Sequence, residues 1–417
     1  MYYNNILNDI LKIFNNNIIF NDNDMEELKN NIYLSIIDYI KINISEIINY
    51  DFNINLITSI KNIYFIQLKE IYDIDEYILN YKIELLIKEC MKNIFKKYMP
   101  PRSYRYSFLR KINIDKNIIK QKISIIKNTP QPQQRTDEWY KFRHNLITAS
   151  SIWKTLKSQS TINQIIYEKC KPYTVPNMND VNSPLHWGHK YEPVSVNFYE
   201  HLYNTKVGDY GCIKHPKYYY IGASPDGINI DENNDRYGRM LEIKNIVNRK
   251  INGIPKMEYW IQMQVQMETC NLNECDFLET QFKEYSNYND FINDGNFNYT
   301  KDNKLKGIIV AFTYEGNIYY EYAPILLKYE EYDDWEKKVL DKNREKEWVQ
   351  NIYWKLEKFS NVLVLRNKLW FNSILEEVKN IWNIIEKERI NGYEHRAPNK
   401  RSKVNTISTE NKCLINI

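Results

Sequence analysis

The stretches Gly222-Ala223-Ser224-Pro225-Asp226-Gly227 and Leu241-Glu242-Ile243-Lys244 decide the fold of this 417-residue chain. Aromatic and β-branched residues fill 218–223 and 240–247, so both segments suit strands. A run of Asp, Asn and Gly separates them and supplies a turn, which predicts one β-hairpin. Because side chains alternate along a strand, Glu242 and Lys244 share one face, and the neighbouring apolar residues take the other.

The hairpin would bring two carboxylates, Asp226 and Glu242, beside the ammonium group of Lys244. A third acid, Glu192, lies in a predicted helix from Trp187 to about residue 203, whose buried stripe recurs at helical spacing: Tyr191, Val194, Phe198 and Leu202. Mg²⁺ prefers oxygen ligands and leaves several positions to water or phosphate. The three acids and the Ile243 backbone carbonyl are therefore candidate ligands for Mg²⁺, with Mn²⁺ as an alternative. Two such ions can drive phosphodiester hydrolysis, so the pattern favours a metal-dependent nuclease.

These residues resemble the PD-(D/E)XK nuclease superfamily and, within it, the lambda-type exonuclease or YqaJ-like viral recombinase family. Pro225-Asp226 and Glu242-Ile243-Lys244 are similar to the superfamily signature. Further blocks agree in order across roughly residues 130–285: Gln134 to Trp139 with Arg143 and Ile147 to Ser150, Gly188 with Tyr191-Glu192, Tyr259 to Gln264, and the apolar strand 276–282.

The resemblance implies an α/β, restriction-endonuclease-like core, in which a central mixed sheet is flanked by helices, with a helical N-terminal extension. It implies that Asp226 and Glu242 bind metal, with Glu192 completing the site. Lys244 would position or help deprotonate the attacking water. Gln262 would orient Lys244 or the water, with Gln264 as the alternative.

The resemblance also implies that Arg143 and Ser150 grip a terminal 5′-phosphate. The residues themselves favour a phosphate site, because Thr148 is a candidate N-cap for a helix starting at Ala149, and free amides at a helix start attract phosphate. The alternative is that Arg143 and Ser150 serve only capping and surface charge. For His189 we favour a surface role, since oxygens alone suffice for the metal.

The implied activity is 5′→3′ exonuclease action on double-stranded DNA in viral recombination, replication or genome processing. A single-strand annealing protein and a homo-oligomer are the partners that the family suggests. Two alternatives remain open: a structure-specific or nonspecific endonuclease on the same fold, and a catalytically silent DNA-binding scaffold.

The net charge is only +4, so binding to DNA would depend on local clusters of basic residues and not on the charge of the whole chain. One basic segment, interleaved with Tyr and Phe, suits phosphate contacts and base stacking; its alternative is a linker without fixed DNA contact. Its basic residues are Lys92, Lys96, Lys97, Arg102, Arg105, Arg110, Lys111, Lys116, Lys120, Lys122 and Lys127. Six scattered cysteines indicate reduced thiols. Without a signal peptide or an apolar run of about 20 residues, we expect an intracellular, soluble protein without a membrane role, in a viral host's cytoplasm or virus factory.

The chain divides into four predicted parts: a helical domain of unknown role (1–95), a basic linker (96–132), the nuclease domain (133–390) and a disordered polar tail (391–417). In the first part, Met25, Leu28, Ile32, Ile36 and Ile40 form a helical stripe. In the third, we expect strands near 306–314 and 317–325 and helices near 329–358 and 370–390.

Overall fold

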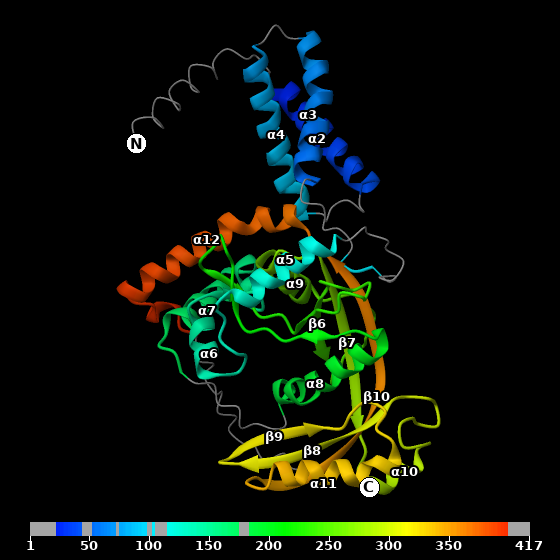
Figure 1. The fold of residues 1–417 in the computed structure, drawn as a ribbon. Coiled ribbons are helices and arrows are strands. Elements are labelled where there is room, and N and C mark those ends of the chain that lie inside the picture. The colour runs from blue at the N-terminus through cyan, green and yellow to red at the C-terminus, as the bar shows by residue number, and fades with distance from the viewer. Residues whose placement is uncertain are drawn as a thin grey trace, which may run out of the picture.

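The computed structural model describes residues 22–43, 52–71, 75–97, 102–104, 115–174 and 183–398. A mixed sheet curls through the molecule with helices on both faces, and a helical N-terminal unit stands at one end (Figure 1). The predicted fold class is confirmed. The domain boundaries stay predictions, and the basic residues Arg105, Arg110 and Lys111 lie outside the described residues.

The larger sheet has seven strands in the order β2-β5-β6-β7-β10-β8-β9. Only β6 and β7 pair in parallel; the other neighbours are antiparallel. Its strands are β2 (Val207–Gly208), β5 (Gly227–Asn229), β6 (Met240–Asn245), β7 (Glu274–Glu284), β8 (Lys306–Tyr314), β9 (Asn317–Tyr322) and β10 (Glu347–Leu365). A smaller sheet has the order β1-β4-β3, from β1 (Ile147–Thr148), β3 (Ile213–Lys214) and β4 (Ile221–Ala223).

The predicted pairing of 218–223 with 240–247 is wrong. β4 joins the smaller sheet, and the hairpin partner of β6 is β5, with Gly227 opposite Leu241. Pro225 lacks an N–H for a strand ladder, so the chain leaves one sheet at Ser224 and enters the other at Gly227. A Cβ on Gly227 would meet Val207 Cγ1 at 2.1 Å, so only glycine lets β2 pack there. Asp226 therefore lies at the junction of the two sheets.

Helix α8 (Pro184–Tyr203) covers one face of the larger sheet. Ser183 caps it by accepting the His186 N–H at 3.1 Å. Its buried residues Tyr191, Val194 and Phe198 pack with apolar side chains of β6 and β7, including Leu241, Ile243 and Leu278. The predicted stripe fails only at its last member, Leu202, which is 40% exposed.

On the opposite face, α9 (Met257–Cys270) packs on β7 and β10, and α12 (Lys368–Asn391) packs in turn on α9 and on α7 (Gln159–Cys170). Trp260, Met263, Met267 and Cys270 of α9 recur at helical spacing and are buried there. Met240 and Phe277 project to this side, while Leu241 and Leu278 project to the α8 side, so β6 and β7 are buried on both faces.

The predicted helix near 329–358 is wrong in its second half. Helix α11 ends at Lys342 (Tyr332–Lys342), and the chain then forms β10, which pairs with β8 along its first half and β7 along its second. Ile352, Trp354 and Leu356 are buried at a spacing of two, which is the strand period. Bulges at Trp348/Gln350 and Leu356/Lys358 break that alternation and obscure it in the sequence.

The N-terminal unit consists of α2 (Asp22–Ile42), α3 (Phe52–Ile71) and α4 (Glu76–Lys97), and α4 packs on α12. Leu28, Ile32 and Ile36 are buried as predicted. Helices α5 (Lys116–Asn128) and α6 (Asp137–His144) then lead into the core. No helix among the described residues is both long and apolar enough to cross a bilayer.

The start of the predicted polar tail has a fixed place. A 3₁₀ turn at Glu394–Arg396 follows α12, and Arg396 makes a bidentate ion pair with Glu388, with both contacts at 2.6 Å. Residues 399–417 of the tail, including Cys413, lie outside the described residues. The other five cysteines are free and buried: Cys90, Cys170, Cys212, Cys270 and Cys275.

A buried charge network fixes the end of the β6–β7 pair away from the candidate site. Asp276, which has no exposed surface, accepts Arg236 at 2.6 Å, Arg239 at 3.2 Å and the Tyr199 hydroxyl at 2.6 Å. Arg239 also bonds Glu274 at 3.0 Å. Every member has partners, which a buried charge requires.

Replacing Asp276 with Asn should lower the free energy of unfolding by about 3–5 kcal/mol, because Arg236 and Arg239 would keep a buried charge without their shared carboxylate. Urea denaturation measures the loss. The control Asp38→Asn, at the exposed pair with Lys41, should change stability by less than about 1 kcal/mol. Equal effects of the two variants would contradict the role of the network.

Candidate active site

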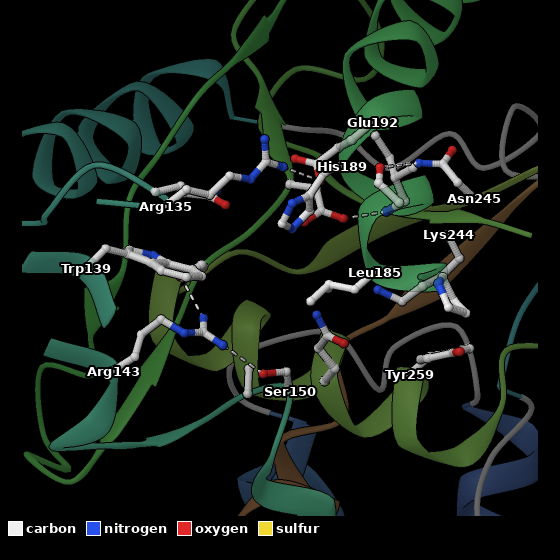
Figure 2. A pocket seen from close by; sticks show the side chains of 18 of the residues that line it. Arg135, Trp139, Arg143, Ser150, Leu185, His189, Glu192, Lys244, Asn245 and Tyr259 are labelled. Carbon is white, nitrogen blue, oxygen red and sulfur yellow. Dashed lines mark hydrogen bonds and ion pairs between the residues drawn. The ribbon is translucent and has the colours of Figure 1, made fainter. Parts of the chain in front are cut away.

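The predicted site residues lie around one cavity of about 430 Å³ at the junction of the two sheets (Figure 2). Glu192 enters its wall from α8, Asp226 from the switch between sheets, and Lys244 from β6. Arg143 of α6 and Ser150, just after β1, form another part of the wall. The cavity thus has an acidic side and a basic side.

Glu242 lies beneath the cavity and has no exposed surface. One carboxylate oxygen forms an ion pair with Lys244, two residues along the same face of β6. The other accepts the Gln266 side-chain amide at 2.7 Å, and that amide also reaches the Ser224 carbonyl at 3.2 Å. Both oxygens are held, so the carboxylate has a fixed orientation.

Asp226 is tied to the same strand through the backbone. Its Oδ2 accepts the Ile243 N–H at 2.7 Å, which joins the two quoted stretches directly. Burial and the nearby carboxylates of Glu242 and Glu192 raise the pKa of Asp226 well above its ordinary value, against the opposing pull of Lys244. The acids are therefore close enough to repel one another.

Lys244 partly neutralises this negative charge. Burial alone would lower its pKa, but Glu242 and Asp226 outweigh that effect, and the pKa of Lys244 lies above its ordinary value. Its ammonium group also lies 5.1 Å from the centre of the Tyr259 ring. Lys244 is thus a cation in the cavity wall at any physiological pH.

Glu192 has a cation of its own, which the sequence did not reveal. Its Oε2 accepts the Arg135 guanidinium at 2.6 Å (Figure 2). Burial raises the pKa of Glu192, while Arg135 and Lys244 pull it down and Glu242 pushes it further up. The charges of Arg135, Lys244 and Glu242 therefore all act on the Glu192 carboxylate.

The candidate metal ligands are carboxylate oxygens near the backbone of Ile243, and oxygen ligands are the type that a hard divalent cation prefers. The geometry fits less completely: within the part of the chain that the structure describes, no three acid, His or Cys side chains are grouped closely enough to hold one ion. The reason is visible in the pairings, because Glu192 bonds Arg135 and Glu242 bonds Lys244.

Arg143 and Ser150 are in contact, with Nη2 donating to the Ser150 Oγ at 3.1 Å. Arg143 also donates to Ser224 Oγ at 3.2 Å and lies over the Trp139 ring at 4.1 Å. Behind it, Lys169 donates to the Arg143 carbonyl at 2.7 Å. Burial, followed by the charge of Arg143, lowers the pKa of Lys169 to about 7. The basic side is therefore a rigid cluster that favours an anion.

The predicted N-cap at Thr148 is wrong. Thr148 ends β1, and the Ala149 N–H donates to the Gly222 carbonyl at 2.8 Å, so strand pairing uses the amide that would have begun the helix. The following helix is a short 3₁₀ segment at Ile152–Leu156. The basic side of the cavity therefore depends on side chains and not on a helix start at Ala149.

The three glutamines of α9 have different surroundings. Gln262 lines the cavity. Gln264 is buried and holds the chain after β10, through the Leu365 carbonyl at 2.8 Å and the Asn367 N–H at 2.6 Å, so it does not serve as the alternative to Gln262. Gln266, which helical spacing groups with Gln262, contacts Glu242 and is fully buried. No signal in the sequence singles it out.

His189 lines the cavity, contrary to the predicted surface role. Burial, together with Arg135 and His186, lowers its pKa to about 4. The ring is therefore neutral near pH 7. His189 lies one turn before Glu192 on the same side of α8, so both side chains line the cavity.

The fold and site define a mixed α/β domain with an acid–lysine cavity where two sheets meet. Residues 138–273 match the YqaJ-like viral recombinase domain. The middle of the chain is thus similar to this domain family, and the matched range contains every predicted site residue.

One curated protein, the uncharacterized protein R354 of Acanthamoeba polyphaga mimivirus, is 27% identical over 325 residues, which cover 68% of this chain. The alignment spans 58% of that protein's length. Two solved structures are also similar: LHK-Exo in complex with dAMP (19% identity) and an alkaline exonuclease, LHK-Exo, from Laribacter hongkongensis (18% identity). In both comparisons the TM-score is 0.35, with 61% of this chain and 94% of the other covered.

Replacing Asp226 with Asn should stabilise the fold at alkaline pH. Because the folded-state pKa of Asp226 is raised, ionising it costs folding free energy above the ordinary Asp pKa of about 4. The gain of Asp226→Asn should therefore grow from pH 5 to pH 9, to about 1 kcal/mol or more, while the Ile243 N–H keeps an acceptor. Thermal unfolding across that range measures it. The exposed Asp209→Asn is the control, and a pH-independent difference would argue against charge crowding.

Proposed function

We propose that this protein is a metal-dependent DNA nuclease that hydrolyses phosphodiester bonds, with 5′→3′ exonuclease action on double-stranded DNA. The observation that carries the proposal is the convergence of Glu192, Asp226 and Lys244 on one cavity, above Glu242 and opposite Arg143 with Ser150. The YqaJ-like domain match supports the same activity.

Glu192, Asp226 and Glu242, with the Ile243 carbonyl, would hold Mg²⁺ or Mn²⁺. When bound, such an ion lowers the pKa of a water ligand and polarises the phosphoryl oxygen. Lys244 would place a positive charge beside the attacking oxygen and the charge that develops on phosphorus. Gln266 would keep Glu242 oriented, and Gln262 faces the space where a water could be held.

The basic side would bind the terminal 5′-phosphate. Arg143 offers a forked, charge-assisted contact, and its stacking on Trp139 fixes the plane of the guanidinium. Ser150 adds a hydroxyl donor. A terminal phosphate held in the same cavity as the acids would bring the end of a DNA strand to them, and this supports an exonuclease over the endonuclease and the silent scaffold.

The biological role that fits is viral recombination, replication or genome processing, since the matched domain is of the viral recombinase type and the mimivirus protein is related. A strand annealing protein would use the single-stranded product, and a homo-oligomer would keep the enzyme on DNA. We place this activity in the host cytoplasm or a virus factory.

Replacing Glu242 with Gln should reduce hydrolysis of a linear duplex in Mg²⁺ by about 10³-fold or more, because a fixed charge at the reacting centre is lost. Release of acid-soluble nucleotides measures the rate, and circular dichroism checks the fold. The matched control is Glu376→Gln, an exposed acid that should keep full activity. Full activity of Glu242→Gln would favour the scaffold alternative.

A 5′-phosphorylated linear duplex should be degraded about tenfold faster than the same duplex with a 5′-hydroxyl, and a closed circle should stay intact. Ser150→Ala should remove most of that preference and leave the rate on 5′-hydroxyl ends unchanged, since the proposed role of this hydroxyl, which lies against Arg143, is confined to the terminal phosphate. Ser158→Ala is the control. Cutting of the closed circle would establish the endonuclease alternative instead.

A further inference from the structure

Arg135 has a strained backbone between two anchored neighbours. Its φ is +68°, in the left-handed region that residues other than glycine seldom adopt. Before it, the Gln134 side chain donates to the Tyr210 carbonyl at 2.8 Å and the Pro225 carbonyl at 3.2 Å. After it, Thr136 caps α6 by accepting the Trp139 N–H at 3.2 Å. Such strain persists where its surroundings enforce it, and it is concentrated at functional sites.

The enforced backbone directs the Arg135 guanidinium to Glu192 (Figure 2). The pair is partly open to solvent, with 36% of the Arg135 side chain and 26% of the Glu192 side chain exposed. The Lys244–Glu242 pair differs, because Glu242 has no exposed surface and is also held by Gln266. Of the two cations paired with these acids, Arg135 has the more accessible pair, because Glu192 keeps some exposed surface and Glu242 has none.

The Arg135–Glu192 pair also stands between two hollows. A second cavity of about 320 Å³ lies beside the first, and Gln134, Arg135, Glu192 and Asp226 line both. The remaining wall of the second cavity comes from the segment before α6, from α8 and from the β2 region: Gln133, Pro193, Val196, Asn197, Val207, Gly208 and Asp209. Moving the Arg135 side chain would therefore change the boundary between the two cavities.

We propose that Arg135 is a latch on Glu192: its guanidinium and a divalent cation compete for the same carboxylate, and the released guanidinium binds a DNA phosphate. The proposal rests on the proposed function in taking Glu192 as a metal ligand. It accounts for the direct pairing of Arg135 with Glu192 in the cavity wall. It makes Arg135 a positioning residue that couples metal binding to DNA binding.

Mn²⁺ binding tests the competition without reference to hydrolysis. Arg135→Gln should bind Mn²⁺ about tenfold more tightly than the natural chain, the effect of removing one unit charge a few ångströms from a divalent ion in a partly hydrated cleft. Isothermal titration calorimetry and Mn²⁺ electron paramagnetic resonance measure the affinity. Arg135→Lys keeps the charge and should stay near the natural value. Arg344→Gln, at an exposed arginine paired with Asp341, controls for net charge.

The shared carboxylate gives a second, stricter test. In the background of Glu192→Gln, the substitution Arg135→Gln should change Mn²⁺ affinity by less than about twofold, because the group under competition is gone. Unchanged or weaker Mn²⁺ binding by Arg135→Gln in the natural background would overturn the latch. A full tenfold gain that persists without Glu192 would also overturn it.

DNA binding tests the second half of the proposal. In Ca²⁺, fluorescence anisotropy with a 5′-phosphorylated duplex should show several-fold weaker binding for Arg135→Gln and partial recovery for Arg135→Lys. Equal DNA affinities of the natural chain, Arg135→Gln and Arg135→Lys would show that the guanidinium does not bind a DNA phosphate. Failure of the nuclease proposal is separable, since it is judged by hydrolysis in Glu242→Gln and not by these affinities.

Discussion

The hydrogen bond from the Ile243 N–H to Asp226 is the contact on which the site depends. It joins a residue at the switch between two sheets to the middle of β6, which has sheet neighbours on both sides. Without it, Asp226 would belong to a loop whose position Pro225 and Gly227 only partly restrict. With this hydrogen bond, the Asp226 carboxylate is held close to Glu242, which repels it. The cavity lies at this junction of the two sheets.

Concentrating acids at this junction raises the pKa of Asp226 and Glu192 through burial and mutual repulsion. The fold tolerates this because it supplies a cation for two of the acids and because the far end of β6 and β7 is held by Asp276 with its arginines. The network around Asp276 therefore stabilises the fold outside the cavity, since each of its charged groups has a hydrogen-bond or ion-pair partner. The acids are left in an arrangement that a cation can reorganise.

Part of this could be read from the sequence. The alternation in β6 placed Glu242 and Lys244 on one face, and the 3.6-residue spacing in α8 identified most of its buried side, because period and burial are local properties. Other assignments failed for stated physical reasons. The 218–223 strand joins the smaller sheet because Pro225 interrupts the ladder, and β10 escaped notice because two bulges disturb its alternation.

The sequence by itself determined the chemical inventory and the local periods: a Pro-Asp turn, an acid and a lysine two positions apart, and an amphipathic helix that carries Glu192. Only the tertiary structure decided which groups meet. Gln266 rather than Gln264 holds Glu242, Arg135 pairs with Glu192 across 57 positions, and His189 faces the cavity. Such partners are set by strand register and helix rotation, which are long-range outcomes of packing that no local pattern records.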